Sequence, residues 1–213
     1  VLEFYYKYMM GKPYAAQQFQ PINSKQGRSK MKVTSFGEVL WDDFPSGKVL
    51  GGAPLNVLVR LQSFGVDTAI ISRRGDDADG EELLRQIQAK NVNTDLLQVC
   101  KECDTSLVKV ILDKCGSASY EIVYPCAWDR IVIEDAALQR VDAFVFGSLA
   151  TRDEVSRAAL DKLMEKAKFK IFDVNLRKPH YDTDRLLATM KRADMLKLND
   201  DELYELSAIY GSP

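Results

Sequence analysis

The sequence predicts an α/β fold: a doubly wound, mostly parallel sheet in three layers, with helices on both faces. Three observations predict it. Short apolar runs typical of buried strands alternate with longer amphipathic stretches typical of helices. Polar residues gather where the strand runs end, although the strand bodies are apolar. One pair of strand runs has no helix between them, which indicates a small antiparallel sheet beside the main one.

The composition excludes several classes of protein. The 213 residues are enough for one sizeable core, or for one domain with an appendage. A hydrophobic content of 46% and a charged content of 28% are typical of a globular protein. The net charge of −2 offers no basic field for nucleic acid or an anionic membrane, and the apolar runs are too short to span a bilayer. We therefore expect neither nucleic acid nor a membrane as a partner.

Residues 1–30 differ from the rest of the chain. They are rich in Tyr and Met at first and then in Gln, Ser, Asn and Lys, and the first residue is not Met. We interpret them as a tag, an upstream extension or a poorly ordered arm, and exclude them from the fold. The domain is expected to span residues 31–213.

Four cysteines are present, at positions 100, 103, 115 and 126. Cys100 and Cys103 form a single CxxC pair. A zinc site would need a second pair or several histidines, and His180 is the only histidine. A redox CxxC usually opens a helix, whereas this pair follows a strand-like run. We favour structural thiols over a metal or redox role, and unpaired thiols fit the cytoplasm.

The stretch Gly51-Gly52-Ala53-Pro54-Leu55-Asn56 allows two interpretations. Two glycines permit a tight backbone path and leave no side chain between the main chain and a ligand. Pro54 suits the start of a helix, with an apolar stripe that includes Leu58 and Phe64 and an end at Gly65. Asn56 would lie in the first turn, where an amide can bind a polar ligand. These residues alone do not decide between a plain turn and a ligand site.

The first half of the domain alternates strands and helices until residue 92. Strands are expected at 33–36 and 68–72, and helices at 54–64 and 79–92. The runs 106–112 and 119–124 are strands joined by a short turn, so they should pair antiparallel. Such an insertion, about residues 104–126, suits a lid or a dimer contact. The alternative is a plain antiparallel edge of the main sheet.

The second half returns to alternation. The expected strands are 143–147, 170–176 and 195–198. The expected helices are 133–141, 151–167, 183–193 and 199–210, the second of them opened by a capping box from Thr151 to Glu154.

Polar side chains lie at the carboxyl ends of the predicted strands, where open α/β sheets bind ligands. In chain order they are Glu38, Asp42, Asp76, Asp77, Ser148, Asp173, Asn175, Arg177, Lys197, Asn199 and Glu202. Carboxylates and amides together can bind several hydroxyls, as a sugar requires, and one carboxylate can hold a hydrated Mg²⁺. Each also has a plainer interpretation: Asn199 with Glu202 is a capping-box pattern, Asp42 a solvated loop acid and Arg177 a surface charge.

Taken together, these segments resemble a known family. The segments are 37–42, 51–56 followed by Gly65 and Gly75, 127–129, 172–177 with its Asp-x-Asn-Leu-Arg pattern, and 196–202 with its Asn-x-x-Glu pattern. From about Met31 to Pro213 the chain resembles the N-terminal two-thirds of a PfkB-type sugar kinase of the ribokinase family. Within that family it looks most like bacterial fructokinases.

The resemblance implies a ribokinase-like fold and transfer of the ATP γ-phosphoryl group to a primary hydroxyl of a sugar. It implies that Asp42, Gly51, Gly52 and Asn56 hold the sugar and that Arg177 meets substrate or phosphate. The same resemblance implies that the nucleotide phosphates are bound by Asn175, Lys197 and Asn199. It also implies that Mg²⁺ is bound by Glu202. The lid would exclude water and is a candidate homodimer contact.

Two features depart from the family pattern. Leu58 stands where the signature usually has a small residue. More seriously, the sequence contains no Gly-Ala-Gly-Asp segment, which in the family supplies the general base and the anion hole. We therefore expect this polypeptide alone to be nearly inactive. The alternative is a non-catalytic sugar-binding or dimerising fragment. A dinucleotide-binding oxidoreductase is disfavoured because no Gly-x-Gly-x-x-Gly follows the first strand.

Overall fold

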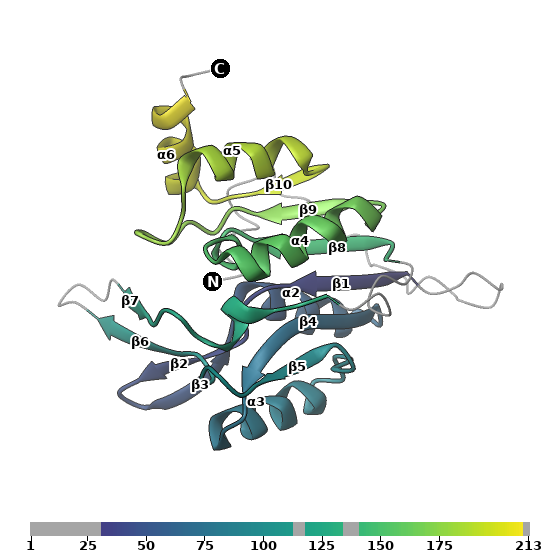
Figure 1. Ribbon diagram of the computed structural model, residues 1–213, viewed down its shortest axis with the longest axis vertical. Coiled ribbons are helices and arrows are strands. Elements are labelled where there is room, and N and C mark those ends of the chain that lie inside the picture. Colours follow the sequence, from purple (N-terminus) through teal and green to yellow (C-terminus); the bar gives the residue numbers. More distant parts are fainter. Residues whose placement is uncertain (1–30, 113–117, 134–140, 211–213) are drawn as a thin grey trace, which may run out of the picture.

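A computed structural model describes residues 31–112, 118–133 and 141–210, in which the strands form two sheets (Figure 1). The main sheet has the strand order β10-β9-β8-β1-β4-β5, and all of its pairings are parallel. Its strands are β1 (Lys32–Phe36), β4 (Asp67–Gly75), β5 (Leu97–Cys100), β8 (Ala143–Gly147), β9 (Lys170–Asp173) and β10 (Met195–Lys197). The predicted parallel sheet is confirmed.

Helices cover both faces of this sheet. Helices α2 (Ala53–Gln62) and α3 (Ala78–Ala89) pack on one face, against strand residues that include Val33, Ile70 and Val145. Helices α4 (Glu154–Lys166), α5 (Thr183–Arg192) and α6 (Asp200–Tyr210) contribute to the core on the other face. Residues along a strand point alternately to the two faces, so each face has its own apolar core. The predicted three-layer arrangement is confirmed.

Stacked aromatic rings form the centre of the second core. The ring of Phe146 lies 5.4 Å from that of Phe144 and 5.3 Å from that of Phe172. All three are buried beneath α4 residues such as Leu160 and Leu163. This packing fixes β8 against β9, the two strands whose carboxyl ends carry several of the candidate site residues.

The second sheet has the order β3-β2-β6-β7, formed by β2 (Leu40–Phe44), β3 (Gly47–Gly51), β6 (Leu107–Leu112) and β7 (Ala118–Ile122). Strands β6 and β7 pair antiparallel, as predicted. They belong to a separate sheet, so the alternative of a plain edge of the main sheet is wrong. The sheet is mixed, because β2 pairs parallel with β6. Figure 1 shows it beside the end of the main sheet from which β1 continues into β2.

Some sequence predictions were wrong or incomplete. Strands β2 and β3 were not predicted, because their exposed face carries acids, lysine and glycine. Helix α4 is capped by Asp153, which accepts from the Val155 N–H, while Thr151 lies in a 3₁₀ turn. Phe64 is 68% exposed, since α2 already ends at Gln62.

Several predictions lie outside the described residues. These are the arm at 1–30, the turn at 113–116 and most of the helix at 133–141. Among the helices that the structure describes, none is long and apolar enough to cross a membrane.

Candidate functional site

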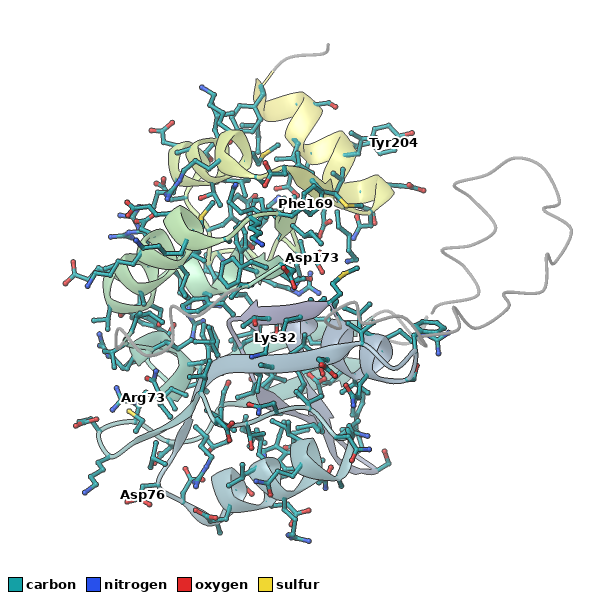
Figure 2. All side chains as sticks on the ribbon, turned by 90° about the vertical axis from the view of Figure 1, so that its right-hand side faces the viewer. Lys32, Arg73, Asp76, Phe169, Asp173 and Tyr204 are labelled. Atoms are coloured by element: carbon teal, nitrogen blue, oxygen red, sulfur yellow. The ribbon has the colours of Figure 1, made fainter. Side chains whose placement is uncertain are left out.

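The carboxyl ends of the main-sheet strands gather most of the polar residues predicted from the sequence. Chain segments leave β1, β9 and β10 at this edge, and α2 begins here after β3. Asp76 and Asp77 do not join the group, and Figure 2 shows Asp76 far from Asp173. Asp77 instead caps α3 by accepting from the Gly80 N–H, and it also accepts from the Thr105 N–H and hydroxyl. Its role is structural.

Asp42 and Gly51 approach each other closely in the β2–β3 hairpin. A Cβ atom at Gly51 would collide with the Oδ2 atom of Asp42 and press on Leu40. Glycine at position 51 therefore makes room for the carboxylate. Burial raises the pKa of Asp42 above its usual value, and the positive charge of Arg177 partly opposes that rise. A half-buried carboxylate is thus held beside the buried backbone of Gly51, with Arg177 within electrostatic reach.

Gly52 forms the entrance to α2 in a backbone conformation that favours glycine. Its φ is 114°, and a Cβ atom there would collide with the carbonyl oxygen of Glu38. As the N-cap residue it has no side chain to satisfy the first helical N–H groups. The N–H of Ala53 donates instead to the Oε1 atom of Glu38, at 3.3 Å. Asn56, in the first turn, is exposed, so its amide can contact a ligand.

Glu38 is a buried carboxyl whose importance the sequence interpretation missed. It is 1% exposed, and its Oε2 atom has no hydrogen-bond partner within the described residues. Burial raises the pKa of Glu38 to about 7; the charge of Asp173 adds to the rise, while backbone hydrogen bonds and Arg177 oppose it. The available signal was an acid placed directly after a buried strand, at Gly37-Glu38.

Arg177 connects the end of β9 with the second sheet. Its Nη1 atom donates to the carbonyl of Leu176 at 2.8 Å, and its guanidinium lies 5.5 Å from the ring centre of Tyr120 in β7. Its charge also acts on Glu38 and Asp42. The structure therefore places this predicted residue between the two sheets and near the predicted sugar ligand Asp42.

Lys197 and Asp173 form an ion pair between neighbouring strands. The Nζ atom of Lys197 lies 2.9 and 2.8 Å from the two carboxylate oxygens of Asp173. Asp173 is buried, and Figure 2 labels it on the main sheet. Just beyond it, Asn175 adopts a left-handed φ of 39°, and its carbonyl accepts from the Ser148 hydroxyl at 3.2 Å. The turn after β9 is thereby tied to the turn after β8.

Asn199 and Glu202 form the reciprocal capping box that was the plainer interpretation of this pair. The Oδ1 atom of Asn199 accepts from the Glu202 N–H at 2.8 Å, and the Oε2 atom of Glu202 accepts from the Asn199 N–H at 2.9 Å. The Oε1 atom of Glu202 accepts from the Leu176 N–H at 3.0 Å. Glu202 is buried and joins the start of α6 to the loop after β9.

Metal binding at this edge would depend on few protein ligands. Within residues 31–112, 118–133 and 141–210, no three His, Cys, Asp or Glu side chains gather closely enough to hold a metal ion. Each Glu202 oxygen accepts one hydrogen bond and retains a second lone pair. Such a site fits Mg²⁺, which keeps several waters and usually takes only one or two carboxylates together with substrate phosphates.

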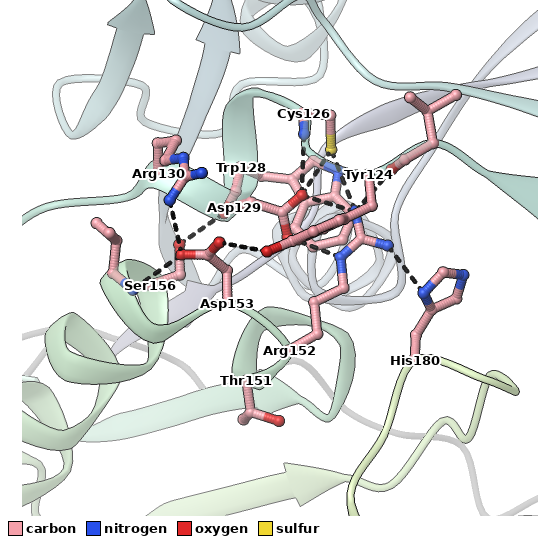
Figure 3. A network of polar contacts seen from close by, with 12 residues as sticks. Tyr124, Cys126, Trp128, Asp129, Arg130, Thr151, Arg152, Asp153, Ser156 and His180 are labelled. Carbon is pink, nitrogen blue, oxygen red and sulfur yellow. Dashed lines mark hydrogen bonds and ion pairs between the residues drawn. The ribbon is translucent and has the colours of Figure 1, made fainter.

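A second polar network surrounds Arg152, at the return from the second sheet (Figure 3). The Nε and Nη2 atoms of Arg152 each lie 2.7 Å from an oxygen of Asp129, which is fully buried in the 3₁₀ helix η1 (Ala127–Arg130). The guanidinium also lies 4.1 Å from the ring centre of Trp128 and 5.1 Å from that of Tyr124. This clamp joins segments far apart in the chain, so the sequence alone did not reveal it.

A cavity of about 340 Å³ opens beside this network. It is lined by Tyr124, Thr151, Arg152, Pro179, His180, Tyr181, Asp182 and Arg185. Burial and the neighbouring charge of Arg152 lower the pKa of His180, whose Nδ1 atom is 3.4 Å from the guanidinium. The three cysteines within the described residues, Cys100, Cys103 and Cys126, are free thiols.

Comparison with known proteins identifies the family. Residues 33–211 match the family described as pfkB family carbohydrate kinase. Fructokinase-2 from Zea mays is 30% identical over 196 residues, covering 80% of this chain and 58% of the maize protein. The chain therefore spans less than two-thirds of the length of this relative.

Solved structures show the same fold. Fructokinase from Xylella fastidiosa, crystallised with bound ATP, is 25% identical with a TM-score of 0.77, covering 86% of this chain and 62% of that one. An uncharacterized sugar kinase from Pyrococcus horikoshii is 25% identical with a TM-score of 0.76, covering 84% and 69%. With a family match that spans most of the domain and a ribokinase-like fold, this chain belongs to the pfkB family of carbohydrate kinases.

Proposed function

We propose that this chain is the sugar-binding part of an ATP-dependent kinase that phosphorylates a primary hydroxyl of a small sugar, with fructose as the first candidate. The observation that carries the proposal is the convergence of Asp42, Gly51 and Arg177 between the two sheets. A carboxylate next to glycine backbone, with a guanidinium within electrostatic reach, suits a polyhydroxylated ligand. The similarity to fructokinases supports fructose over other sugars.

Each predicted sugar ligand has a defined part in the proposal. The Asp42 carboxylate accepts hydrogen bonds from hydroxyls, and the exposed amide of Asn56 donates or accepts. Gly51 and Gly52 offer main-chain groups to the sugar, and the space that side chains would take there is filled by Asp42 and the Glu38 carbonyl. Arg177 contacts the sugar or the transferred phosphate. The second sheet covers the sugar and excludes water, which would otherwise accept the phosphoryl group.

ATP and Mg²⁺ are the proposed cofactors, and the residues present fit them. Lys197 would contact the phosphates through its amino group, Asn199 through its amide and Asn175 through the turn that it shapes. Glu202 would take part in holding Mg²⁺, which neutralises charge on the transferred phosphoryl group. The ATP complex of the related Xylella fastidiosa fructokinase supports ATP as the nucleotide.

The expected activity of this polypeptide alone is low. Its sequence contains no Gly-Ala-Gly-Asp segment, and loss of a general base typically reduces a rate by about 10² to 10⁴. The test is a coupled assay of ADP release with ATP and fructose, alongside calorimetric titration of fructose. Fructose binding without appreciable turnover supports the proposal. Turnover at about 1–100 per second contradicts the expected inactivity, and absence of sugar binding contradicts the function.

A non-catalytic, dimerising fragment is the second candidate. Exposed apolar side chains favour it, namely Val49 and Tyr120, which share one face of the second sheet, and Val123 just after the sheet. We propose that this face forms a homodimer contact. Sedimentation analysis of the wild type and of Val49→Lys tests it: a dimer that the lysine weakens supports the contact, and a monomer at all concentrations contradicts it.

The cytoplasm is the proposed compartment, because free thiols suit reducing conditions.

A further inference from the structure

The position of Glu38 points to a role that direct contact with the sugar does not require. The carboxyl lies between β1 and β2 and faces the start of α2, where Oε1 accepts from the Ala53 N–H. Ala53 follows Gly52 and belongs to the same turn as the predicted sugar ligand Asn56. A contact to this N–H therefore acts on the backbone that the sugar would touch.

The start of α2 needs a partner from elsewhere in the chain. A helix leaves its first N–H groups unsatisfied, and an N-cap side chain usually accepts one of them. Gly52 has no side chain, and it cannot be replaced by a capping residue without a collision between the new Cβ and the Glu38 carbonyl oxygen. Glu38 therefore shapes this turn in two ways. Its carbonyl oxygen leaves no room for a Cβ atom at position 52, and its carboxyl accepts the Ala53 N–H in place of an N-cap side chain.

We propose that Glu38 is a positioning residue that holds the Gly51–Gly52 turn and the first turn of α2 in the geometry that binds the sugar. This inference rests on the proposed function, because it assigns a purpose to the same glycine turn. The buried carboxyl acts through Ala53 rather than on the substrate. Its charge state then decides how firmly the turn is held.

The surroundings of Glu38 couple this role to pH. Oε1 is occupied by the Ala53 N–H, so a bound proton resides on Oε2, the atom without a partner in the described residues. The charged groups that act on it are Asp173, paired with Lys197 in β10, and Arg177. Burial places the pKa of Glu38 at about 7, so the carboxyl changes charge near neutrality. The ionised form accepts the N–H more strongly and also interacts favourably with the positive end of the helix dipole.

The first measurement is amide hydrogen exchange of residues 51–56, which needs no sugar. Glu38→Ala should exchange these amides at least about tenfold faster than wild type, because the N–H of Ala53 loses its acceptor. Glu38→Gln keeps an acceptor oxygen and should restore most of the protection. Asp77→Asn is the matched control: Asp77 also caps a helix, but α3 lies away from the glycine turn. Equal protection of residues 51–56 in Glu38→Ala and wild type would overturn the proposal.

The second measurement is calorimetric titration of fructose between pH 6 and pH 8. The wild-type affinity should rise by about fivefold over this range, since a charge-assisted hydrogen bond is stronger than a neutral one. Glu38→Gln should bind fructose with little dependence on pH. A pH dependence that persists in Glu38→Gln would contradict the role of Glu38. Wild type that binds no fructose at any pH would instead reject the proposed function, while the exchange result would still test the positioning.

Discussion

Lys197 is paired directly opposite Asp173 in the main sheet, and its amino group contacts both carboxylate oxygens. The two members differ in environment: Asp173 is buried, whereas the Lys197 side chain is 43% exposed. A lysine in this position can keep one partner in the protein and still reach toward solvent at the edge where the phosphates are proposed to bind. We therefore expect the ion pair to stabilise the fold through Asp173, while the Lys197 amino group also takes the proposed phosphate-binding role.

Lys197→Met should lower the free energy of unfolding by about 1–3 kcal/mol, because the buried Asp173 carboxylate loses its hydrogen-bonded cation. Urea unfolding monitored by circular dichroism measures this change. The control is Lys48→Met, which removes a lysine paired with Asp79 where both side chains are about 40% exposed. Such an exposed pair should contribute only about 0–1 kcal/mol. Equal losses in the two variants would show that burial of Asp173 does not matter.

Gly51→Ala should weaken fructose binding by at least about tenfold, because its new methyl group would displace the Asp42 carboxylate. Calorimetric titration at constant pH measures the affinity, and circular dichroism checks that the variant folds. Gly65→Asn is the control: position 65 has open space and a φ of 76°, which asparagine tolerates. Unchanged affinity in Gly51→Ala would argue against the sugar-binding role of the hairpin end.

Removal of Arg152 should be strongly destabilising. Arg152→Met leaves the fully buried Asp129 carboxylate without its cation, which typically costs about 3–5 kcal/mol. Arg152→Lys should recover only part of the loss, because lysine cannot make two parallel bonds to one carboxylate. Thermal unfolding and urea titration give the values. Arg192→Ala, which breaks an exposed pair with Asp161, is the control and should change stability little. A full rescue by lysine would contradict the bidentate geometry.

Glu202→Gln should destabilise the chain even without nucleotide. Glutamine has one acceptor oxygen, so either the Leu176 or the Asn199 N–H loses its buried partner, at about 1–3 kcal/mol. Asp201→Asn, at the exposed neighbouring position, is the control. A separate titration of ATP with and without Mg²⁺ tests the proposed metal role. If only the Mg²⁺-dependent part of the ATP affinity falls and stability is unchanged, the capping role is wrong.

The stability of the wild type should fall as the pH rises through neutrality. The folded pKa of Glu38 is about 7, above its ordinary value of 4.5, so the native state binds more protons than the unfolded state between these values. The resulting stabilisation is complete below about pH 4.5 and is lost as the pH rises through 7, by about 3 kcal/mol at most. Glu38→Gln removes this contribution. Urea unfolding at pH 5 and pH 8 should show the smaller change in Glu38→Gln; parallel changes would contradict the assignment.

Patterns of apolar residues were sufficient to predict the main sheet. The expected strand at 143–147 coincides with β8, and the helix expected at 183–193 ends one residue from the observed end of α5. Strand β2 was missed because Asp42 and Asp43 interrupt its apolar pattern. Phe64 was predicted to be in the core on helical spacing alone. Helix α2 ends at Gln62, so Phe64 lies beyond the helix and its side chain is exposed. Periodicity reports which face is apolar and says little about where an element stops.

Candidate site residues were predictable where they follow strands, and less so where contacts join distant segments. Arg177 lies near enough to Asp42 for its charge to lower the pKa of that carboxyl, and the sugar-binding role of both residues stays a prediction. The burial of Glu38 could not be predicted, because it depends on α2 and the end of β9 closing over it. The pair formed by Asp129 and Arg152 depends on the return path of the second sheet, which no local pattern specifies.

The clamp around Arg152 fastens one end of the second sheet to the main body of the protein. Arg152 binds the Val123 carbonyl as well as Asp129, so the strand that leaves the second sheet is fastened to the body of the protein at its base. The chain enters β6 through Thr105, whose N–H donates to Asp77 at 2.7 Å, so both ends of the β6–β7 hairpin are fastened to the main body. Because both ends of this hairpin are held, its Tyr120 ring is kept facing the Arg177 guanidinium, and the covering side of the proposed sugar site is preformed.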